Sequence, residues 1–388
     1  MSALQGKFGI RVPTKPSVGD YVEALRASFD ALHASSGRYP VELPIGAHGL
    51  PEGHQWAHLL QQADGSLRPI ARLEVKEVVS CDPDQPDPAK AYASKITLST
   101  AGTAIDGKVT PGHHLLMLNT STEAGFSGDV APALQDRERG VSEVLAGLSD
   151  ADRAHLREAP IRNYSIFSER GGDRDQQGRN AHSVTLLVRR QGSCSTHLVT
   201  SKPGDVVLAA VPMSHSFVGP DNQTPALFFG LGTSVSPFRA MLKTRTRADR
   251  PPASSQLYIN HKYQKFEYAA EELRAIADDP NNKVTYHPLF SQEPEKSGGV
   301  ARLSDLVAQA DQARAMFQVI LQPDFHLYIS GILGLSEQIL DGLKATAASI
   351  SPILGEVISQ RLDAAQRAGR IHIEGSAARE VPMPLQGT

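Results

Sequence analysis

From residue 70 onward, short apolar runs alternate with turns that are rich in Asp, Pro and Gly. These runs lie at residues 71–79, 91–98, 114–118 and 183–190. Short runs bounded by such turn residues are typical of antiparallel strands. Because the runs follow one another closely, this part of the chain predicts a small antiparallel β-barrel.

After residue 225 the pattern changes, and strand-like runs alternate with segments whose apolar residues recur at helical spacing. The strand-like runs are 226–229, 256–259, 283–288 and 326–330, and the helix-like segments are 238–246, 269–277, 303–310 and 335–349. This alternation predicts a doubly wound parallel sheet with helices on both faces, so the whole chain is expected to be an α/β protein with an additional β domain. In such a sheet, ligands bind at the carboxyl ends of the strands.

Residues 1–68 follow neither pattern and are predicted to form an N-terminal extension of unknown role. Within it, residues 18–34 carry apolar side chains at helical spacing, which predicts an amphipathic helix that needs an apolar surface to bury. The extension also contains three closely spaced histidines, His48, His54 and His58. Because no carboxylate or cysteine pattern accompanies them, surface or packing histidines are favoured over a metal site.

The composition excludes several classes of function. The 388 residues carry a formal net charge of −3, so the basic excess of a nucleic-acid-binding protein is missing. Two cysteines, Cys81 and Cys194, are too few for a disulfide framework or a four-thiolate iron–sulfur cluster. The sequence has neither an apolar run of about 18 residues nor a charged-then-apolar leader. We therefore expect a cytoplasmic protein that binds neither nucleic acid nor a membrane.

Three stretches carry candidate chemistry. Arg162-Asn163-Tyr164-Ser165 places a cation two residues before an aromatic ring and a hydroxyl, which suits a diphosphate, a flat conjugated ring and one polar atom of that ring. In Gly192-Ser193-Cys194-Ser195-Thr196, the backbone N–H groups of small residues can surround a phosphate where a helix begins. Residues 230–238 form a glycine turn between a strand-like and a helix-like segment, which a dinucleotide phosphate can approach closely.

In this order and spacing the three stretches resemble the ferredoxin-NADP reductase family, especially the reductase half of diflavin enzymes such as sulfite reductase flavoprotein. The family patterns are R-x-Y-S, G-x-x-[ST] and G-x-G-T-G-x-A-P-F. The first is matched fully, whereas the third has Ser234 and Ser236 in place of a glycine and an alanine. Each stretch alone is weak evidence, because ordinary strand ends and turns produce such patterns, but three in series favour the family.

The resemblance covers residues 69–376 and implies a domain organisation. A FAD-binding barrel is expected at 69–220, with a short helical insert at 121–160, and an NAD(P)-binding-like domain at 221–376. A polar tail follows at 377–388. Diflavin reductases carry a much larger helical insertion in place of 121–160, so any docking surface that this insertion provides is in question here.

The resemblance also implies which residues bind FAD. Arg162 would meet the diphosphate, Tyr164 would pack on the isoalloxazine ring, and Ser165 would lie near the reactive N5 edge. The alternative interpretation of Tyr164 is a tyrosine of the barrel core. The remaining candidates for FAD binding are Asn163, Thr185, Leu186, Leu187, Gly192, Ser193, Cys194 and Ser195.

The nucleotide site departs from the family pattern. Ser291-Gln292 stands where the family has the S-R pair that reads the 2′-phosphate of NADP, and glutamine offers only neutral hydrogen bonds in place of a charged bidentate grip. Lys296 and Arg302 are candidates to compensate. The other nucleotide-binding candidates are Gly232, Thr233, Ser234, His261 and Lys262, the last two standing in place of a family C-R pair. We expect NADPH or NADH with poor discrimination.

The hydride-transfer site departs as well. Ser330 replaces the cysteine that lies near the transferred hydride in the family, and Ile332 replaces the aspartate that follows. Glu374 stands in place of the terminal acidic residue, whereas the aromatic residue that shields the flavin falls near Ser376. The resemblance thus implies Ser165, Ser330 and Glu374 as the catalytic residues.

These matches and departures leave three hypotheses. The first is a FAD-dependent oxidoreductase that takes electrons from a nicotinamide nucleotide and passes them to a separate acceptor, which would be a flavodoxin, a ferredoxin or a cytochrome. The second is a repurposed FAD-binding biosynthetic enzyme that acts on a small substrate in the altered nicotinamide pocket. The third is a non-enzymatic flavin-binding interaction protein.

Overall fold

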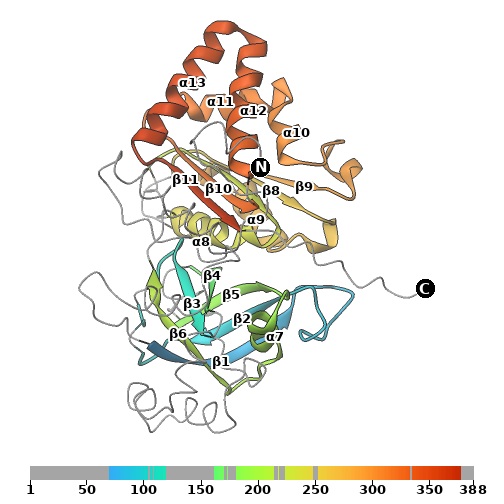
Figure 1. Cartoon of the computed structure of the whole chain (residues 1–388), viewed down its shortest axis with the longest axis vertical. Coiled ribbons are helices and arrows are strands. Elements are labelled where there is room, and N and C mark those ends of the chain that lie inside the picture. The colour runs from blue at the N-terminus through green and yellow to red at the C-terminus, as the bar shows by residue number, and fades with distance from the viewer. Residues whose placement is uncertain are drawn as a thin grey trace, which may run out of the picture.

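The structure, a computed structural model, describes residues 70–376 apart from 104, 108, 119–160, 170–172, 174–180, 214–216, 218–222, 248–251 and 333. The chain first forms a barrel and then a parallel sheet with its helices. The barrel lies in the lower half of Figure 1 and the sheet in the upper half. The predicted extension, the insert at 121–160 and the tail at 377–388 lie outside the described residues.

The predicted antiparallel barrel is confirmed. Its strands are β1 (Ile70–Ser80), β2 (Ala93–Ser99), β3 (His114–Leu118), β4 (Ile161–Ser165), β5 (Ser183–Arg189) and β6 (Val206–Met213). They pair in the order β4-β3-β6-β1-β2-β5. A single antiparallel bridge between Ile166 and Leu186 joins the two edges of this sheet and closes it. The helix α7 (Ser193–Thr200) follows β5 and packs on the barrel.

Strand β5 is buried along almost its whole length because both of its faces are covered. Val184, Leu186 and Val188 point into the core of the barrel. Leu187, on the opposite face, packs in a cluster with residues of the parallel sheet, including Phe228. A continuous apolar run is what a strand needs when it is covered on both sides, so β5 contributes to the core of the barrel and to the cluster shared with the parallel sheet.

The predicted parallel sheet is also confirmed. Its strands are β7 (Ala226–Leu231), β8 (Ser255–His261), β9 (Val284–Phe290), β10 (His326–Ile332) and β11 (Ile371–Ser376). They pair in the order β11-β10-β7-β8-β9, and every pairing is parallel. The helices are α8 (Val235–Thr246), α9 (Ala270–Asp278), α10 (Leu303–Val307), α11 (Ala310–Ile320), α12 (Leu335–Ile350) and α13 (Pro352–Arg367).

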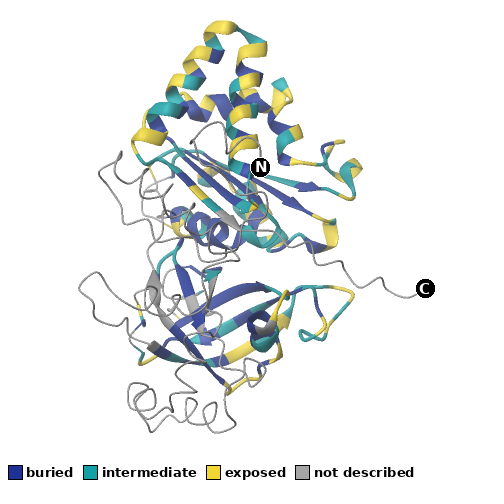
Figure 2. Ribbon diagram, in the orientation of Figure 1, coloured by how far each residue is buried: buried dark blue, intermediate teal, exposed yellow. Residues whose placement is uncertain are grey.

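Alternate residues of the central strand β7 face the two helical layers, as the two-residue period of a strand requires. Leu227 and Phe229 pack with α10 to α13 on one face, and Ala226 and Phe228 pack with α8 and α9 on the other. The outer helices turn their exposed residues away from the sheet (Figure 2). None of the helices in the described part of the chain is long and apolar enough to cross a membrane.

A charged cluster ties the segment that leaves β4 to the first helices of the parallel sheet. It consists of Glu169, Asp173, Arg239, Lys243, Arg247 and Glu272. Arg239 of α8 is its centre, because this guanidinium is only 1% exposed and donates to the Phe167 carbonyl at 2.7 Å. The same guanidinium lies 4.2 Å from the Phe167 ring centroid. The cluster therefore fixes how the barrel sits beneath the sheet.

Candidate active site between the barrel and the sheet

The carboxyl ends of the parallel strands form one edge of the candidate site. Ser330 of β10 lies in register with Glu374 of β11 on one side and with Gly230 of β7 on the other. Gly230 is in turn in register with Ile259 of β8. A row of backbone positions thus crosses the sheet at the edge where doubly wound sheets bind their ligands.

The barrel supplies the other edge through His114, which begins β3. Its antiparallel partner is Ser165, the last residue of β4. His114 Nε2 lies 3.0 Å from Ser165 Oγ and 2.7 Å from Oε1 of Glu374. The structure therefore brings together the three predicted catalytic residues, with Glu374 reaching the barrel directly and Ser330 beside it in the sheet. Sequence reasoning missed His114 as a site residue.

A tight turn delivers His114 to this junction. The backbone N–H of His113 donates to the Thr110 carbonyl at 3.1 Å, with Pro111 and Gly112 between them, and Gly112 has a φ of +85°. Proline at the second position and glycine with positive φ at the third define a type II turn. This turn is the signal that could have drawn attention to the histidines that follow it.

The stretch Arg162 to Ser165 lies in strand β4. Arg162 and Asn163 pair with Met117 and Leu116 of β3, and the structure fixes their backbone positions. Tyr164 is half-buried and packs against the apolar core of the barrel. Its ring is therefore partly accessible, and both interpretations of Tyr164 remain compatible with its position.

Helix α7 presents an open N-terminus to an anion. Its N-cap, Gly192, is exposed, and a side-chain carbon added there would meet no atom within 4 Å. Ser195 Oγ accepts from the N–H groups of Gln191 and Gly192 at 2.8 and 2.9 Å, which anchors the turn. The first turn contains no acidic residue. Cys194 is buried at 3% exposure, so its side chain belongs to the core.

The candidates on β5 are held by packing. Leu186 is fully buried in the barrel core, and Leu187 is 5% exposed against the parallel sheet. The Thr185 hydroxyl lies 3.2 Å from the hydroxyl of Thr97. A cofactor that runs along this strand would thus contact its backbone rather than these side chains.

The two glycines of the turn after β7 differ in their surroundings: Gly230 is closely packed against other side chains, and Gly232 faces open space. A side-chain carbon on Gly230 would lie 2.8 Å from Ile259 Cδ1 and 2.9 Å from Phe238 Cε2. Gly232 has a φ of +54°, and nothing lies within 4 Å of an added carbon. Thr233 and Ser234 complete a short 3-10 turn, η2 (Gly232–Ser234), and are half-buried. The turn therefore presents free space next to the carboxyl end of β7.

The loop after β9 is tied to the end of β8 by two backbone hydrogen bonds. The N–H of Ser291 donates to the His261 carbonyl, and that of Gln292 donates to the Lys262 carbonyl, each at 2.9 Å. Gln292 is exposed, and the Lys296 ammonium lies 2.6 Å from Oε1 of Glu293. Arg302 is exposed at the N-cap of α10. Part of the positive charge near Gln292 is thus already offset by Glu293.

His261 lies beneath this region, with 1% of its surface exposed. Its ring packs between Tyr268 and Phe290, with ring centroids 5.7 and 6.3 Å away. Neither ring nitrogen has a hydrogen-bond partner among the described residues. Burial lowers the pKa of His261 to about 3. The ring is therefore held neutral in an apolar environment and does not reach the surface of the site.

Replacing His261 with phenylalanine should leave stability at pH 7 nearly unchanged and make the protein more resistant to acid. The folded-state pKa of His261 lies below its unfolded value of about 6.5, so the unfolded state binds a proton that the folded state does not. The free energy of unfolding of the wild type is therefore not reduced by this proton above pH 6.5. Below pH 6.5 it falls as the unfolded state takes up the proton, by about 2 kcal/mol at pH 5.

The measurement is urea denaturation of wild type and His261→Phe at pH 7 and pH 5. His113 and His287, whose pKa values burial also lowers, stay in both proteins, so the difference between the two isolates His261. An equal loss of stability in both proteins on acidification would show that His261 does not carry the effect.

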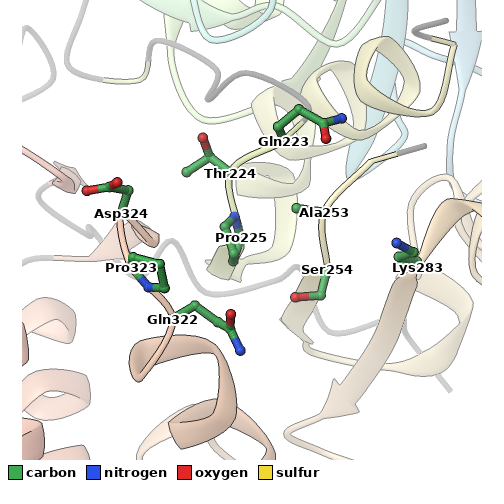
Figure 3. Close-up of a pocket in the computed structure, with 9 residues that line it drawn as sticks. All are labelled: Gln223, Thr224, Pro225, Ala253, Ser254, Lys283, Gln322, Pro323 and Asp324. Carbon is green, nitrogen blue, oxygen red and sulfur yellow. The ribbon is translucent and has the colours of Figure 1, made fainter. Parts of the chain in front are cut away.

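A separate hollow of about 540 Å³ lies at the opposite edge of the parallel sheet. Its lining includes Pro225 and Ser254 just before β7 and β8, with Lys283 and Asp324 on opposite sides (Figure 3). These are the amino ends of the strands, and doubly wound sheets bind ligands at the carboxyl ends. The hollow therefore lies apart from the candidate site.

The chain thus combines an antiparallel barrel with a parallel sheet that is covered by helices on both faces, and polar residues of the two meet at their junction. Residues 228–340 match the model of the oxidoreductase NAD-binding domain family. A solved ferredoxin-NADP+ reductase variant from Plasmodium falciparum, with 2'P-AMP, superposes with a TM-score of 0.52 at 14% identity, covering 81% of this chain and 98% of that one.

Two curated relatives extend the likeness. A cyanelle ferredoxin--NADP reductase from Cyanophora paradoxa is 24% identical over 240 residues, covering 55% of this chain and 61% of the relative. A ferredoxin--NADP reductase from Thermosynechococcus vestitus is 25% identical over 232 residues, covering 55% and 58%. The chain thus spans about three fifths of the length of these relatives. These matches support a relation to the ferredoxin-NADP reductase family. The closer likeness to diflavin enzymes stays a prediction.

Proposed function

We propose that this protein is a FAD-dependent oxidoreductase in which a nicotinamide nucleotide reduces bound FAD and a separate protein accepts the electrons. One observation carries the proposal: residues of the barrel and of the sheet meet at one atom, His114 Nε2. Ser165 Oγ of the barrel lies 3.0 Å from this nitrogen, and Glu374 Oε1 of the sheet lies 2.7 Å from it. Several relatives are named ferredoxin--NADP reductase, which supports a ferredoxin as the acceptor, with a flavodoxin or a cytochrome as alternatives.

The residues present fit FAD. Its diphosphate would lie at the open start of α7, which offers backbone N–H groups and no acidic residue, while Arg162 would add a positive charge from β4. Tyr164 and Ser165 follow on the same strand and would lie along the ring. When bound, FAD supplies the two-electron chemistry of the reaction. Ser165 and Glu374 would orient the reacting partners through hydrogen bonds and keep a proton within reach of the site.

The nucleotide would lie along the carboxyl ends of the parallel strands. Gly232, beside which an added carbon would meet no atom, would give its diphosphate close access to the backbone at the start of α8, while Gly230 lets the turn pack against Ile259 and Phe238. The nicotinamide would then lie beside Ser330, which is in register with Glu374. Ser330 is 5% exposed, so only a small part of this residue would face the nicotinamide.

The test of the proposed function is anaerobic mixing of the FAD-loaded protein with NADPH and, separately, with NADH while the visible flavin absorbance is followed. Bleaching within seconds supports the reductase, and a panel of carrier proteins then identifies the acceptor. Flavin that stays oxidised for many minutes, yet is reduced by dithionite, would overturn it.

One observation favours the second hypothesis, a repurposed enzyme acting on a small substrate. The charged grip on the nucleotide phosphate is weak, because Gln292 is neutral and Lys296 is paired with Glu293. Under this hypothesis the space beside Ser330 would hold the substrate. The protein would then keep FAD while failing to oxidise either nicotinamide nucleotide, so the same mixing experiment separates the two proposals.

Replacing Arg162 with alanine should weaken FAD binding by roughly ten- to a hundredfold, because one charge-assisted contact contributes on the order of 1.5–3 kcal/mol. The measurement is fluorescence titration of the apoprotein with FAD. Arg274→Ala is the matched control, since Arg274 is exposed and pairs with Glu267 of the parallel-sheet half at 2.6 Å. An unchanged FAD affinity in Arg162→Ala would remove this residue from the site.

If nicotinamide nucleotides are used, kcat/KM should be comparable for NADPH and NADH, because Gln292 offers no charge to a 2′-phosphate. Gln292→Arg should then raise the preference for NADPH, by up to about tenfold for one new charged contact. Steady-state kinetics with both nucleotides is the measurement, and Gln322→Arg, at the far edge of the sheet, is the control. A thousandfold native preference for NADPH would show that another group, such as Arg302, reads the phosphate.

A further inference from the structure

We propose that His114 is a positioning residue that holds the Ser165 hydroxyl and the Glu374 carboxylate in one polar chain and sets the direction of the serine's hydrogen bond. This inference rests on the proposed function and names a residue beyond the three implied by the family resemblance. His114 belongs to the barrel and Glu374 to the last strand of the sheet. These polar contacts therefore connect the barrel with the sheet.

The geometry places one nitrogen between two oxygens. Ser165 Oγ and Glu374 Oε1 lie 3.0 and 2.7 Å from the same atom, His114 Nε2. Oε1 of Glu374 is buried and accepts no hydrogen bond of regular geometry among the described residues. A buried carboxylate oxygen is costly unless a positive or hydrogen-bearing group compensates it. The imidazole is the group placed to do so.

The chemistry of the three groups then fixes where the hydrogens lie. A carboxylate only accepts, and a ring nitrogen carries either a hydrogen or a lone pair. Two electron-rich atoms 2.7 Å apart would repel each other, so the distance from Nε2 to the Glu374 carboxylate favours the tautomer with a hydrogen on Nε2. The contact with Ser165 Oγ at 3.0 Å is a hydrogen bond, and in this tautomer the serine oxygen accepts it. The hydrogen of Ser165 is consequently left to be donated toward a ligand in the site.

Several backbone features hold His114 in this position. The type II turn at residues 110–113 ends directly before it, and the pairing of β3 with β6 changes register between His114 and Leu116. Such bulges next to functional sites redirect a side chain. His114 is 5% exposed, so the imidazole is confined by its surroundings. Its orientation is therefore built into the barrel and does not depend on a ligand.

The experiment compares His114→Leu, which removes both contacts, with His114→Gln, whose terminal amide can donate two hydrogen bonds. We expect His114→Leu to lower kcat for nicotinamide-driven flavin reduction on the order of a hundredfold, with KM for the nucleotide and Kd for FAD unchanged. His114→Gln should recover most of this, to within about tenfold of wild type. His113→Gln is the neighbouring control, since His113 Nε2 lies 2.7 Å from Thr110 Oγ1 and outside the chain.

Two further readouts separate positioning from a purely structural contact. If His114 acts through Ser165, His114→Leu should have no further effect on kcat in a Ser165→Ala background. In protein labelled with 15N-histidine, without nucleotide, the ring signals of His114 should shift in Glu374→Gln, whereas those of His113 should not. Additive losses of kcat, equal losses in His114→Gln and His114→Leu, or unchanged ring signals would each overturn the inference.

The outcome is distinguishable from a failure of the proposed function. If wild-type FAD-loaded protein is not reduced by either nucleotide, the reductase proposal fails, while the ring signals still report whether the three-residue chain exists. If wild type is reduced and His114→Leu is reduced at the same rate, only the role of His114 is wrong. Thermal unfolding of each variant identifies any change that comes from loss of the fold.

Discussion

Replacing Arg239 with alanine should lower the free energy of unfolding by about 3 kcal/mol, because it leaves the carboxylates of the charged cluster without their central cation. Arg239 Nε donates to Glu272 Oε2 at 2.6 Å, and its Nη2 lies 3.0 Å from Oδ2 of Asp173. The hydrogen bond to the Phe167 carbonyl is lost as well. Asp173 and Glu272 are more than a third exposed and can regain water, so the expected loss lies at the low end for a buried pair.

The acid dependence of this contribution follows from Asp173. Burial by itself raises the pKa of this carboxyl, but the charge and hydrogen bonds of Arg239 outweigh burial and, with Lys243, hold the pKa below its ordinary value. The folded state therefore binds the proton less readily than the unfolded state. This stabilisation is present above the unfolded pKa of about 3.9 and is lost as the pH falls through the folded value.

Urea denaturation of Arg239→Ala measures the effect, and limited proteolysis shows whether the barrel and the sheet come apart before either unfolds. Arg314→Ala, on the exposed side of α11, is the control and should stay within about 0.5 kcal/mol of wild type. If Arg239→Ala were as stable as the control, the charged cluster would not hold the domains together.

Gly112→Ala should destabilise the protein by more than about 3 kcal/mol, from two sources that add. The φ of +85° costs a residue with a side chain about 1–2 kcal/mol. In addition, the new carbon would overlap the Phe217 carbonyl oxygen and lie 2.8 Å from Met241 Cε. Overpacking of this kind costs typically 1–3 kcal/mol, and more where the obstacle is backbone.

Gly107→Ala is a matched control for this prediction. Gly107 has a φ of +68°, but nothing lies within 4 Å of an added carbon. It should therefore show the backbone cost alone, about 1–2 kcal/mol. Denaturation curves of both variants give the difference. Equal losses would mean that residues 110–113 move away from Phe217 at little cost and that the turn does not hold His114 in place.

The order of strands and helices could be predicted from the sequence because each layer has one clear period. The continuous apolar run of β5 and the alternation after residue 225 both mark elements whose surroundings are apolar. Segment ends were displaced by a few residues, as for α8, which begins at Val235 rather than at 238. The helix α11 and the strand β6 were not predicted.

Residues that meet across domains could not be predicted in the same way. His114 and Glu374 lie far apart in the sequence, and only the register of β3 and the position of β11 bring them together. The burial of His261 could not be predicted either, because a histidine at the end of a strand can equally bind a ligand at the surface or pack in the core. Its packing between Tyr268 and Phe290 depends on β9 and on the turn that precedes α9.

The late position of β11 has a consequence for how the protein is made. The barrel is synthesised early, and domains fold largely in the order in which they leave the ribosome. His114 is therefore in place before Glu374 has been synthesised. Glu374 arrives on the edge strand that is added to β10 after all the other strands of the sheet. A growing chain can thus complete its barrel while the contact between His114 and Glu374 is still missing, and the junction with the sheet forms only after synthesis has passed the last strand.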